Sequence, residues 1–201
     1  MSFRPILIGL VAAVALGSGG FAFYTGVTQG QSVPVVQPTP VSFAVAADQF
    51  RGFSALSNSP PVPMVEMRDE AGQPVTFEKF RGKVVLFNLW ATWCAPCIRE
   101  MPDLNSLQED YANQDFIVVP VASGRQGKEE PAEFLRARGY DALTTYYDPD
   151  SLFLRTFDLD TLPTTFVLDR NGVMRGGVVG LAKWRSDRAK AVIDALLAEK
   201  S

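Results

Sequence analysis

The sequence predicts an α/β domain, because a βαβ pattern occupies its middle, a β-hairpin pattern follows, and an amphipathic helix closes it. Residues 83–90, "KVVLFNLW", form a nearly continuous run of β-branched and aromatic side chains, typical of a strand buried on both faces. A helical pattern follows over about 95–111, and "FIVVPVA" at 116–122 supplies a second strand. These three segments make one βαβ unit.

Further elements are predicted on both sides of this unit. Before it, 62–67 and 73–77 flank the turn-like "RDEAG" and predict a short hairpin. After it, the patterns predict a helix at 131–138, a short strand at 144–149, a helix at 152–157, and strands at 164–169 and 172–180 joined by an Asn171-Gly172 turn. The final segment, 184–200, repeats apolar residues at helical spacing and predicts a helix with one buried face.

Composition bounds the class of protein. The chain has 201 residues, of which 47% are hydrophobic, enough for one well-buried domain and an appendage. Its formal net charge is -3, which argues against nucleic acid as a partner.

The N-terminus predicts export. Residues 5–26 carry no charged side chain, and a helix of that length can cross a hydrocarbon core of about 30 Å. Residues 1–26 are therefore expected to form a single-pass transmembrane signal anchor in the inner (cytoplasmic) membrane. Arg4 places its start in the cytoplasm and the following domain in the periplasm or cell exterior. The alternative is a cleaved signal peptide, which would leave a soluble periplasmic protein.

A linker is predicted over 27–59. This stretch is rich in Pro, Gln, Ser and Thr and shows no sustained period of either 2 or 3.6 residues. Such a composition is typical of a flexible spacer. The folded domain is accordingly expected over 60–201.

The only two cysteines, Cys94 and Cys97, stand three positions apart, and the chain has no histidine. Zinc needs four ligands, usually Cys and His, and copper carriers usually add a histidine to a cysteine pair. We therefore expect no bound metal, and no cofactor. A purely structural disulfide stays possible, but closing so short a loop yields only about 2 kcal/mol.

A redox pair explains the spacing better. If a helix begins near Cys94, the unsatisfied N–H groups and the macrodipole at its N-terminus favour thiolate over thiol, which makes Cys94 the nucleophile. Cys97 lies one turn further along and can resolve a mixed disulfide. Pro96 suits the first turn, where its missing N–H would be unpaired anyway.

The stretch "VVLFNLWATWCAPCIREMP" closely resembles the active-site segment of the membrane-anchored thioredoxin-fold family typified by TlpA, ResA and DsbE (CcmG). The resemblance covers about 60–201 and includes "FRGKVV", "TLPTTFVLDRNG" and "VVG"; the C-terminal segment looks most like TlpA. It implies a thioredoxin-like fold, a central mixed sheet flanked by helices, with an added N-terminal β-hairpin.

The resemblance also implies roles for individual residues. Pro163 matches the family's cis-proline, which leaves the backbone of Leu162 free to pair with an extended substrate segment. Glu100 matches an acidic residue that tunes a thiol or relays a proton, although a solvated surface glutamate is the alternative. Asn88 stands where thioredoxin proper has a buried aspartate, and Trp93 is expected on the apolar contact rim.

We therefore expect a thiol–disulfide oxidoreductase that reduces partner disulfides: Cys94 attacks, and Cys97 releases the reduced partner. The resemblance implies apocytochrome c or copper-assembly proteins as clients, and a membrane thiol reductase that supplies electrons. Two alternatives stay open, a disulfide oxidase or isomerase and a non-catalytic binding module. The loops at 123–130 and 140–147 are candidates for partner selection.

Overall fold

The computed structural model describes residues 41–127 and 130–199. Its strands are β1 (Ser54–Ala55), β2 (Met67–Arg68), β3 (Pro74–Val75), β4 (Val84–Trp90), β5 (Phe116–Ser123), β6 (Tyr146–Asp148), β7 (Thr164–Leu168) and β8 (Met174–Val179). Its helices are α1 (Phe43–Gln49), the 3-10 helix η1 (Phe77–Phe80), α2 (Ala95–Asp110), α3 (Pro131–Ala137), α4 (Leu152–Thr156) and α5 (Asp187–Ala198). The predicted membrane anchor, 1–26, and the first part of the predicted linker lie outside these residues. None of the helices described is long and apolar enough to cross a membrane.

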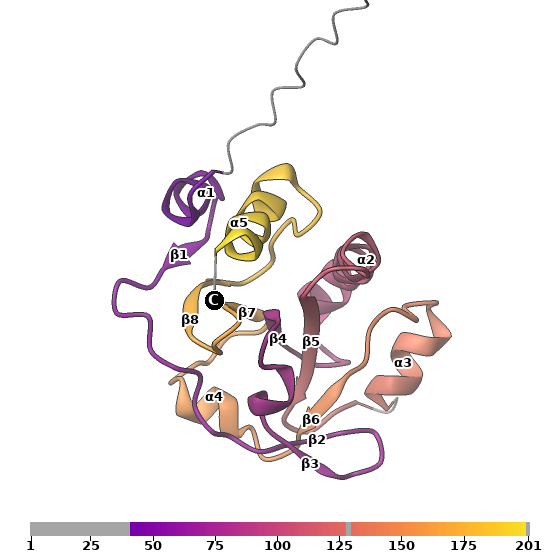
Figure 1. Cartoon of the computed structure of the whole chain (residues 1–201). Helices are drawn as coiled ribbons and strands as arrows, with labels where there is room; N and C mark the ends of the chain where they lie inside the picture. Colours follow the sequence, from indigo (N-terminus) through magenta and orange to yellow (C-terminus); the bar gives the residue numbers. More distant parts are fainter. Residues whose placement is uncertain (1–40, 128–129, 200–201) are drawn as a thin grey trace, which may run out of the picture. The chain divides into compact units, whose positions relative to one another are not determined.

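The strands form one mixed sheet in the order β1-β8-β7-β4-β5-β6-β2-β3, flanked by helices (Figure 1). β4 is parallel to β5 and antiparallel to β7, so the predicted βαβ unit lies at the centre of the sheet. β2 and β3 pair antiparallel, as the hairpin pattern predicted. The α/β fold with a mixed sheet is thereby confirmed.

β4 is buried along its whole length and divides the interior into two clusters. Its even-numbered hydrophobic residues pack with α2, α3 and α5, and its odd-numbered ones pack with η1 and α4. Because side chains alternate across a strand, Asn88 falls on the α2 side. This polar side chain is fully buried.

Pro120 lies inside β5, opposite Asn88 of β4, whereas the sequence suggested a place near the strand end. Its carbonyl accepts a hydrogen bond from Thr145 Oγ1 at 3.2 Å, on the side of β6. The N–H and C=O of one strand residue point toward the same neighbouring strand, so the nitrogen of Pro120 also faces the side of β6. The pairing of β6 with β5 begins only at Val121. The missing N–H therefore interrupts no ladder bond.

Part of the segment predicted as a linker is folded. α1 buries Ala46 and Ala47, and β1 pairs antiparallel with β8. The ring of Phe50, just after α1, lies edge-on to Trp184 with centroids 5.4 Å apart. No side chain caps α1, and it has no acidic residue in its first turn and no basic residue in its last turn, so its sequence signal is weak and packing holds it. The folded domain thus begins before Pro60.

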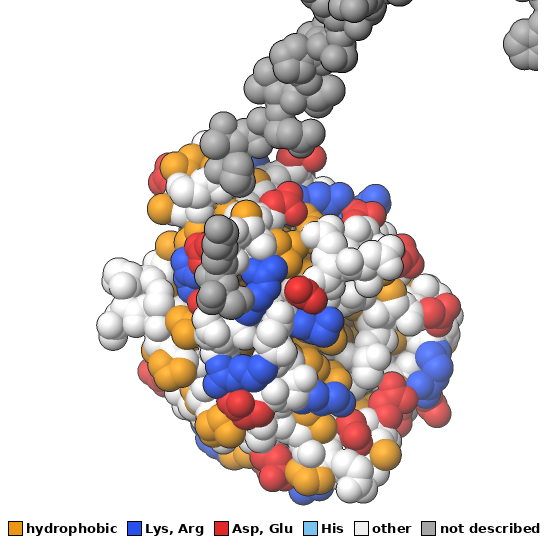
Figure 2. Space-filling model, viewed as in Figure 1, with side chains coloured by type: hydrophobic (Ala, Val, Ile, Leu, Met, Phe, Trp, Pro, Cys, Tyr) orange, Lys and Arg blue, Asp and Glu red, His pale blue; other side chains and the backbone are white. Residues whose placement is uncertain are grey.

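Charged side chains are mixed on the face shown in Figure 2, where Lys/Arg, Asp/Glu and apolar groups alternate. Neither sign forms a continuous field over this face. This view gives no support to a nucleic-acid interface there.

The packing of α1 can be tested by substitution. Phe50→Ala should lower the free energy of unfolding by about 3 kcal/mol, because it removes a buried ring from the contact with Trp184. Val45→Ala, at an exposed position of the same helix, is the control and should change stability by less than about 0.5 kcal/mol. Urea unfolding followed by circular dichroism measures both, and equal small effects would show that α1 adds nothing to the domain.

Candidate active site

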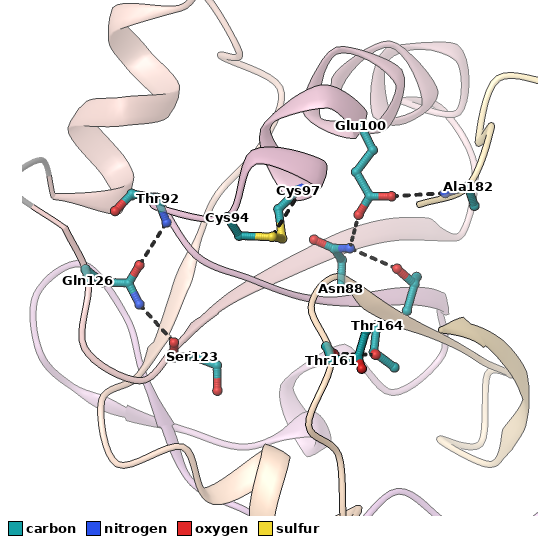
Figure 3. Close-up of a disulfide and its surroundings, with 11 residues drawn as sticks. Asn88, Thr92, Cys94, Cys97, Glu100, Ser123, Gln126, Thr161, Thr164 and Ala182 are labelled. Atoms are coloured by element: carbon teal, nitrogen blue, oxygen red, sulfur yellow. Dashed lines mark hydrogen bonds between the residues drawn. A yellow bond between two sulfur atoms is a disulfide. The ribbon is translucent and has the colours of Figure 1, made fainter. Parts of the chain in front are cut away.

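Cys94 and Cys97 form a disulfide at the N-terminus of α2, with their Cα atoms 5.3 Å apart (Figure 3). Cys94 is the N-cap residue, and its Sγ accepts a hydrogen bond from the N–H of Cys97 at 3.3 Å. Pro96 lies in the first turn, as predicted. Cys94 is 4% exposed and Cys97 is fully buried, so a partner can reach only the first sulfur.

Cys94 lines an open groove of about 580 Å³. Its walls include Trp93, Pro96, Arg125, Leu154, Asp160 and Leu162. The indole of Trp93 is 60% exposed, which fits a place on a contact rim. The peptide bond between Leu162 and Pro163 is cis, and this confirms the isomer that the resemblance implied.

Glu100 lies behind the disulfide, in the interior. Its carboxylate accepts hydrogen bonds from Asn88 Nδ2 at 2.7 Å and from the N–H of Ala182 at 3.5 Å (Figure 3). The side chain is 1% exposed, so Glu100 is not a solvated surface residue. Asn88 Nδ2 also donates to Thr165 Oγ1 at 2.8 Å, and this joins β4, α2 and β7 in one buried polar network.

Burial raises the pKa of Glu100 from 4.5 to about 7. The hydrogen bonds from Asn88 and Ala182 oppose this shift, and so does the indole of Trp184, whereas the charge of Asp103 adds to it. The Trp184 N–H itself has no hydrogen-bond partner within reach. Desolvation outweighs the donors, so the carboxyl group can exchange a proton near neutral pH.

The sequence missed two groups of residues at this site. Ala182 bonds to Glu100 from a segment about eighty positions away, with Trp184 close by, and no local pattern signals such a contact. Gln126 and its neighbours lie within the loop at 123–130 that was a candidate for partner selection, but nothing in their spacing indicated bonds to Thr92. Within 41–127 and 130–199, no group of three or more His, Cys, Asp or Glu side chains is placed to hold a metal ion.

A helix-capping disulfide and a cis Leu162-Pro163 bond whose leucine lines the same groove as Cys94, on a mixed sheet with flanking helices, define the thiol–disulfide oxidoreductases of thioredoxin-like fold. The model of the Redoxin family matches residues 46–193, and the chain belongs to this family.

Curated relatives and solved structures agree with this assignment. The chain is 29% identical to the thiol-disulfide oxidoreductase ResA of Geobacillus thermodenitrificans over 140 residues, which cover 70% of this chain and 79% of that protein. A thioredoxin family thiol:disulfide interchange protein from Chlorobium tepidum is 26% identical, with a TM-score of 0.54 over 71% of this chain and 99% of that chain. The exposed lipoprotein thioredoxin of Streptococcus pneumoniae is 26% identical, with a TM-score of 0.51 over 66% of this chain and 96% of that chain. The protein is a thiol-disulfide oxidoreductase of the ResA and DsbE type.

The pKa of Glu100 makes a prediction about stability. Between pH 4.5 and about 7 the folded protein holds a proton on Glu100 that the unfolded chain has released, so the wild type loses stability as the pH rises. The glutamine of Glu100→Gln cannot ionise. The free energy of unfolding of this variant, relative to that of the wild type, should therefore rise by on the order of 3 kcal/mol between pH 4 and pH 8. Urea unfolding of the oxidised proteins measures this, because the disulfide keeps both cysteines from titrating.

The control is Glu133→Gln, the same substitution at an exposed position on α3. A stability difference between Glu100→Gln and the wild type that stays constant from pH 4 to pH 8 would contradict the burial-driven shift.

Proposed function

We propose that the protein is a membrane-anchored periplasmic reductant of disulfides in partner proteins. The observation that carries the disulfide-exchange reaction in this proposal is the enclosure of Cys97 behind Cys94, at a helix N-terminus that opens into a groove. This asymmetry assigns the attacking role to Cys94 and the resolving role to Cys97. Leu162, on the groove wall, offers its backbone to an extended client segment.

The reaction transfers two electrons in two exchanges. In the reduced protein, the Cys94 thiolate attacks one sulfur of the client disulfide, forms a Cys94–client disulfide and releases the first client thiolate. The Cys97 thiol then loses its proton, and its sulfur attacks Cys94 Sγ. The second client thiolate leaves, the Cys94–Cys97 disulfide forms, and the client has been reduced.

In this proposal Glu100 accepts the proton from Cys97. The two residues are three positions apart on α2, which brings their side chains to the same face of the helix. A carboxyl group with a pKa of about 7 can take up a proton near neutral pH and pass it on. Asn88 cannot replace it as an acid or base and instead holds its carboxylate.

The direction, location and clients rest on similarity. The resemblance to TlpA, ResA and DsbE favours reduction of apocytochrome c thiols or of copper-site cysteines during oxidase assembly, with a membrane thiol reductase returning the electrons. An exported location is supported by the uncharged segment 5–26 and by the pneumococcal relative, which is an exposed lipoprotein. Uncharged segments of this kind also act as cleaved signal peptides. We propose that this one is retained as a membrane anchor.

The assignment of the two sulfurs predicts which variant traps clients. Cys97→Ser should accumulate disulfide-linked complexes with client proteins in the producing cell, because the resolving sulfur is missing. Cys94→Ser should accumulate none, because the attacking sulfur is missing, and the double variant is the matched control. Non-reducing electrophoresis followed by mass spectrometry measures the complexes and identifies the clients.

Two results would count against the proposal. If neither single variant trapped a partner, the cysteines would serve a binding module rather than an enzyme. A reduction potential near that of DsbA, about -120 mV, would indicate an oxidase, whereas one near that of thioredoxin, about -270 mV, is expected for a reductant.

A further inference from the structure

The loop from Ser123 to Gly127 is bound directly to the two residues that precede Cys94. The N–H of Thr92 donates to Gln126 Oε1 at 3.1 Å, and the N–H of Gly127 donates to Thr92 Oγ1 at 3.0 Å. The indole N–H of Trp93 donates to the carbonyl of Arg125 at 2.8 Å. The loop is thus part of the wall beside the attacking sulfur.

Gln126 is the centre of this arrangement (Figure 3). While its Oε1 accepts from Thr92, its Nε2 donates to the carbonyls of Ser123 at 3.1 Å and Gly124 at 2.9 Å. Only a side-chain amide offers one acceptor and two donors in this geometry. All three of these hydrogen bonds hold the loop.

A second set of contacts fixes the far end of the loop. Ser123 Oγ donates to Asp148 Oδ2 at 2.9 Å, and the N–H of Gly124 donates to the Asp148 carbonyl at 2.7 Å. Gly124 has a φ of +71°, and a Cβ there would lie 2.7 Å from Ser151 Oγ. The backbone of Arg125 is therefore held on both sides.

Arg125 is exposed and lines the same groove as Cys94. Its guanidinium forms no ion pair or hydrogen bond with any other residue of the described chain. Asp160 lines the groove as well, and its carboxylate accepts a hydrogen bond from Thr161 Oγ1 at 2.8 Å. The groove thus offers a positive charge at Arg125, whose carbonyl accepts from the indole of Trp93, and a negative charge at Asp160. A guanidinium pairs best with a carboxylate, so the position next to Trp93 favours an acidic side chain.

We propose that Arg125 is a specificity-determining residue that binds an acidic side chain close to the client's disulfide, and that Gln126 is the positioning residue that keeps Arg125 beside Cys94. The occupant is an extended peptide segment of a client protein, because the groove is lined both by this loop at Arg125 and by Leu162, whose backbone the proposed function assigns to an extended segment. This inference rests on the proposed function, since it specifies the client that the same groove accepts.

The test uses three synthetic peptides with one intramolecular disulfide that differ only in Glu, Gln or Lys beside the first cysteine. The reduced full chain is mixed with excess peptide, and the second-order rate constant is measured by acid quench and chromatography. In each turnover the protein dithiol becomes the Cys94–Cys97 disulfide and the peptide disulfide becomes two thiols. The Glu peptide should react about fivefold faster than the Lys peptide, because an exposed ion pair is worth up to about 1 kcal/mol.

The ratio of these two rate constants is the diagnostic quantity, because general damage to the protein lowers both rates alike. Arg125→Glu should reverse the preference, and Arg125→Lys should retain the preference for Glu. Gln126→Leu should bring the ratio close to one. Arg188→Glu, an exposed charge reversal on α5 outside this groove, is the matched control and should leave the ratio unchanged.

The outcomes separate the two claims. If the wild type reduces none of the peptides, the proposed function fails, and this inference fails with it. If it reduces all three at equal rates, or if Arg125→Glu still prefers the Glu peptide, the inference is overturned and the proposed function stands. If Gln126→Leu keeps the wild-type ratio, Gln126 does not position Arg125.

Discussion

The chemistry of this protein depends on the place of one sulfur at the start of one helix. Cys94 Sγ accepts the N–H of Cys97 and sits where the unsatisfied N–H groups and the macrodipole of α2 favour negative charge. The position of Cys94 is fixed because β4, which is buried on both faces at the centre of the sheet, ends four residues before it. The same geometry places Cys97 inside the protein, so the two cysteines differ in access, and the proposed difference in their tasks rests on this.

Two different environments meet at this sulfur pair. On the inner side, Asn88 and Glu100 form a buried polar network in which desolvation raises the pKa of the carboxyl group toward neutrality. On the outer side, Gln126 accepts a hydrogen bond from the N–H of Thr92 and donates to the carbonyl of Ser123, and these bonds hold the loop that forms one wall of the groove. In the mechanism that we propose, the inner network takes up the proton and the outer wall recognises the client. Under that proposal, the choice of client can change without a change in the acid–base group.

The sequence was sufficient where the signal is local. The continuous apolar run before Cys94 predicted the central strand, and the cysteine spacing predicted the redox pair and its place at a helix start, as the structure has them. The helix α1 was missed, because seven uncapped residues have little helical tendency apart from the packing of Phe50 on Trp184. The hydrogen bonds between Ala182 and Glu100 and between Thr92 and Gln126 join segments that are distant in the sequence and that only the fold brings together. Sequence periodicity carries no information about such pairs.

The central claim is that Cys94 is the ionised and accessible sulfur of the reduced protein. Alkylation of the reduced full chain with iodoacetamide across pH 4 to pH 10, with the label located by mass spectrometry, tests it most directly. The account predicts that Cys94 is labelled first, that its rate reaches half its maximum below about pH 8, where an ordinary thiol is still largely protonated, and that Cys97 reacts far more slowly. A half-maximum at or above about pH 8.5, or equal labelling of the two cysteines, would contradict it.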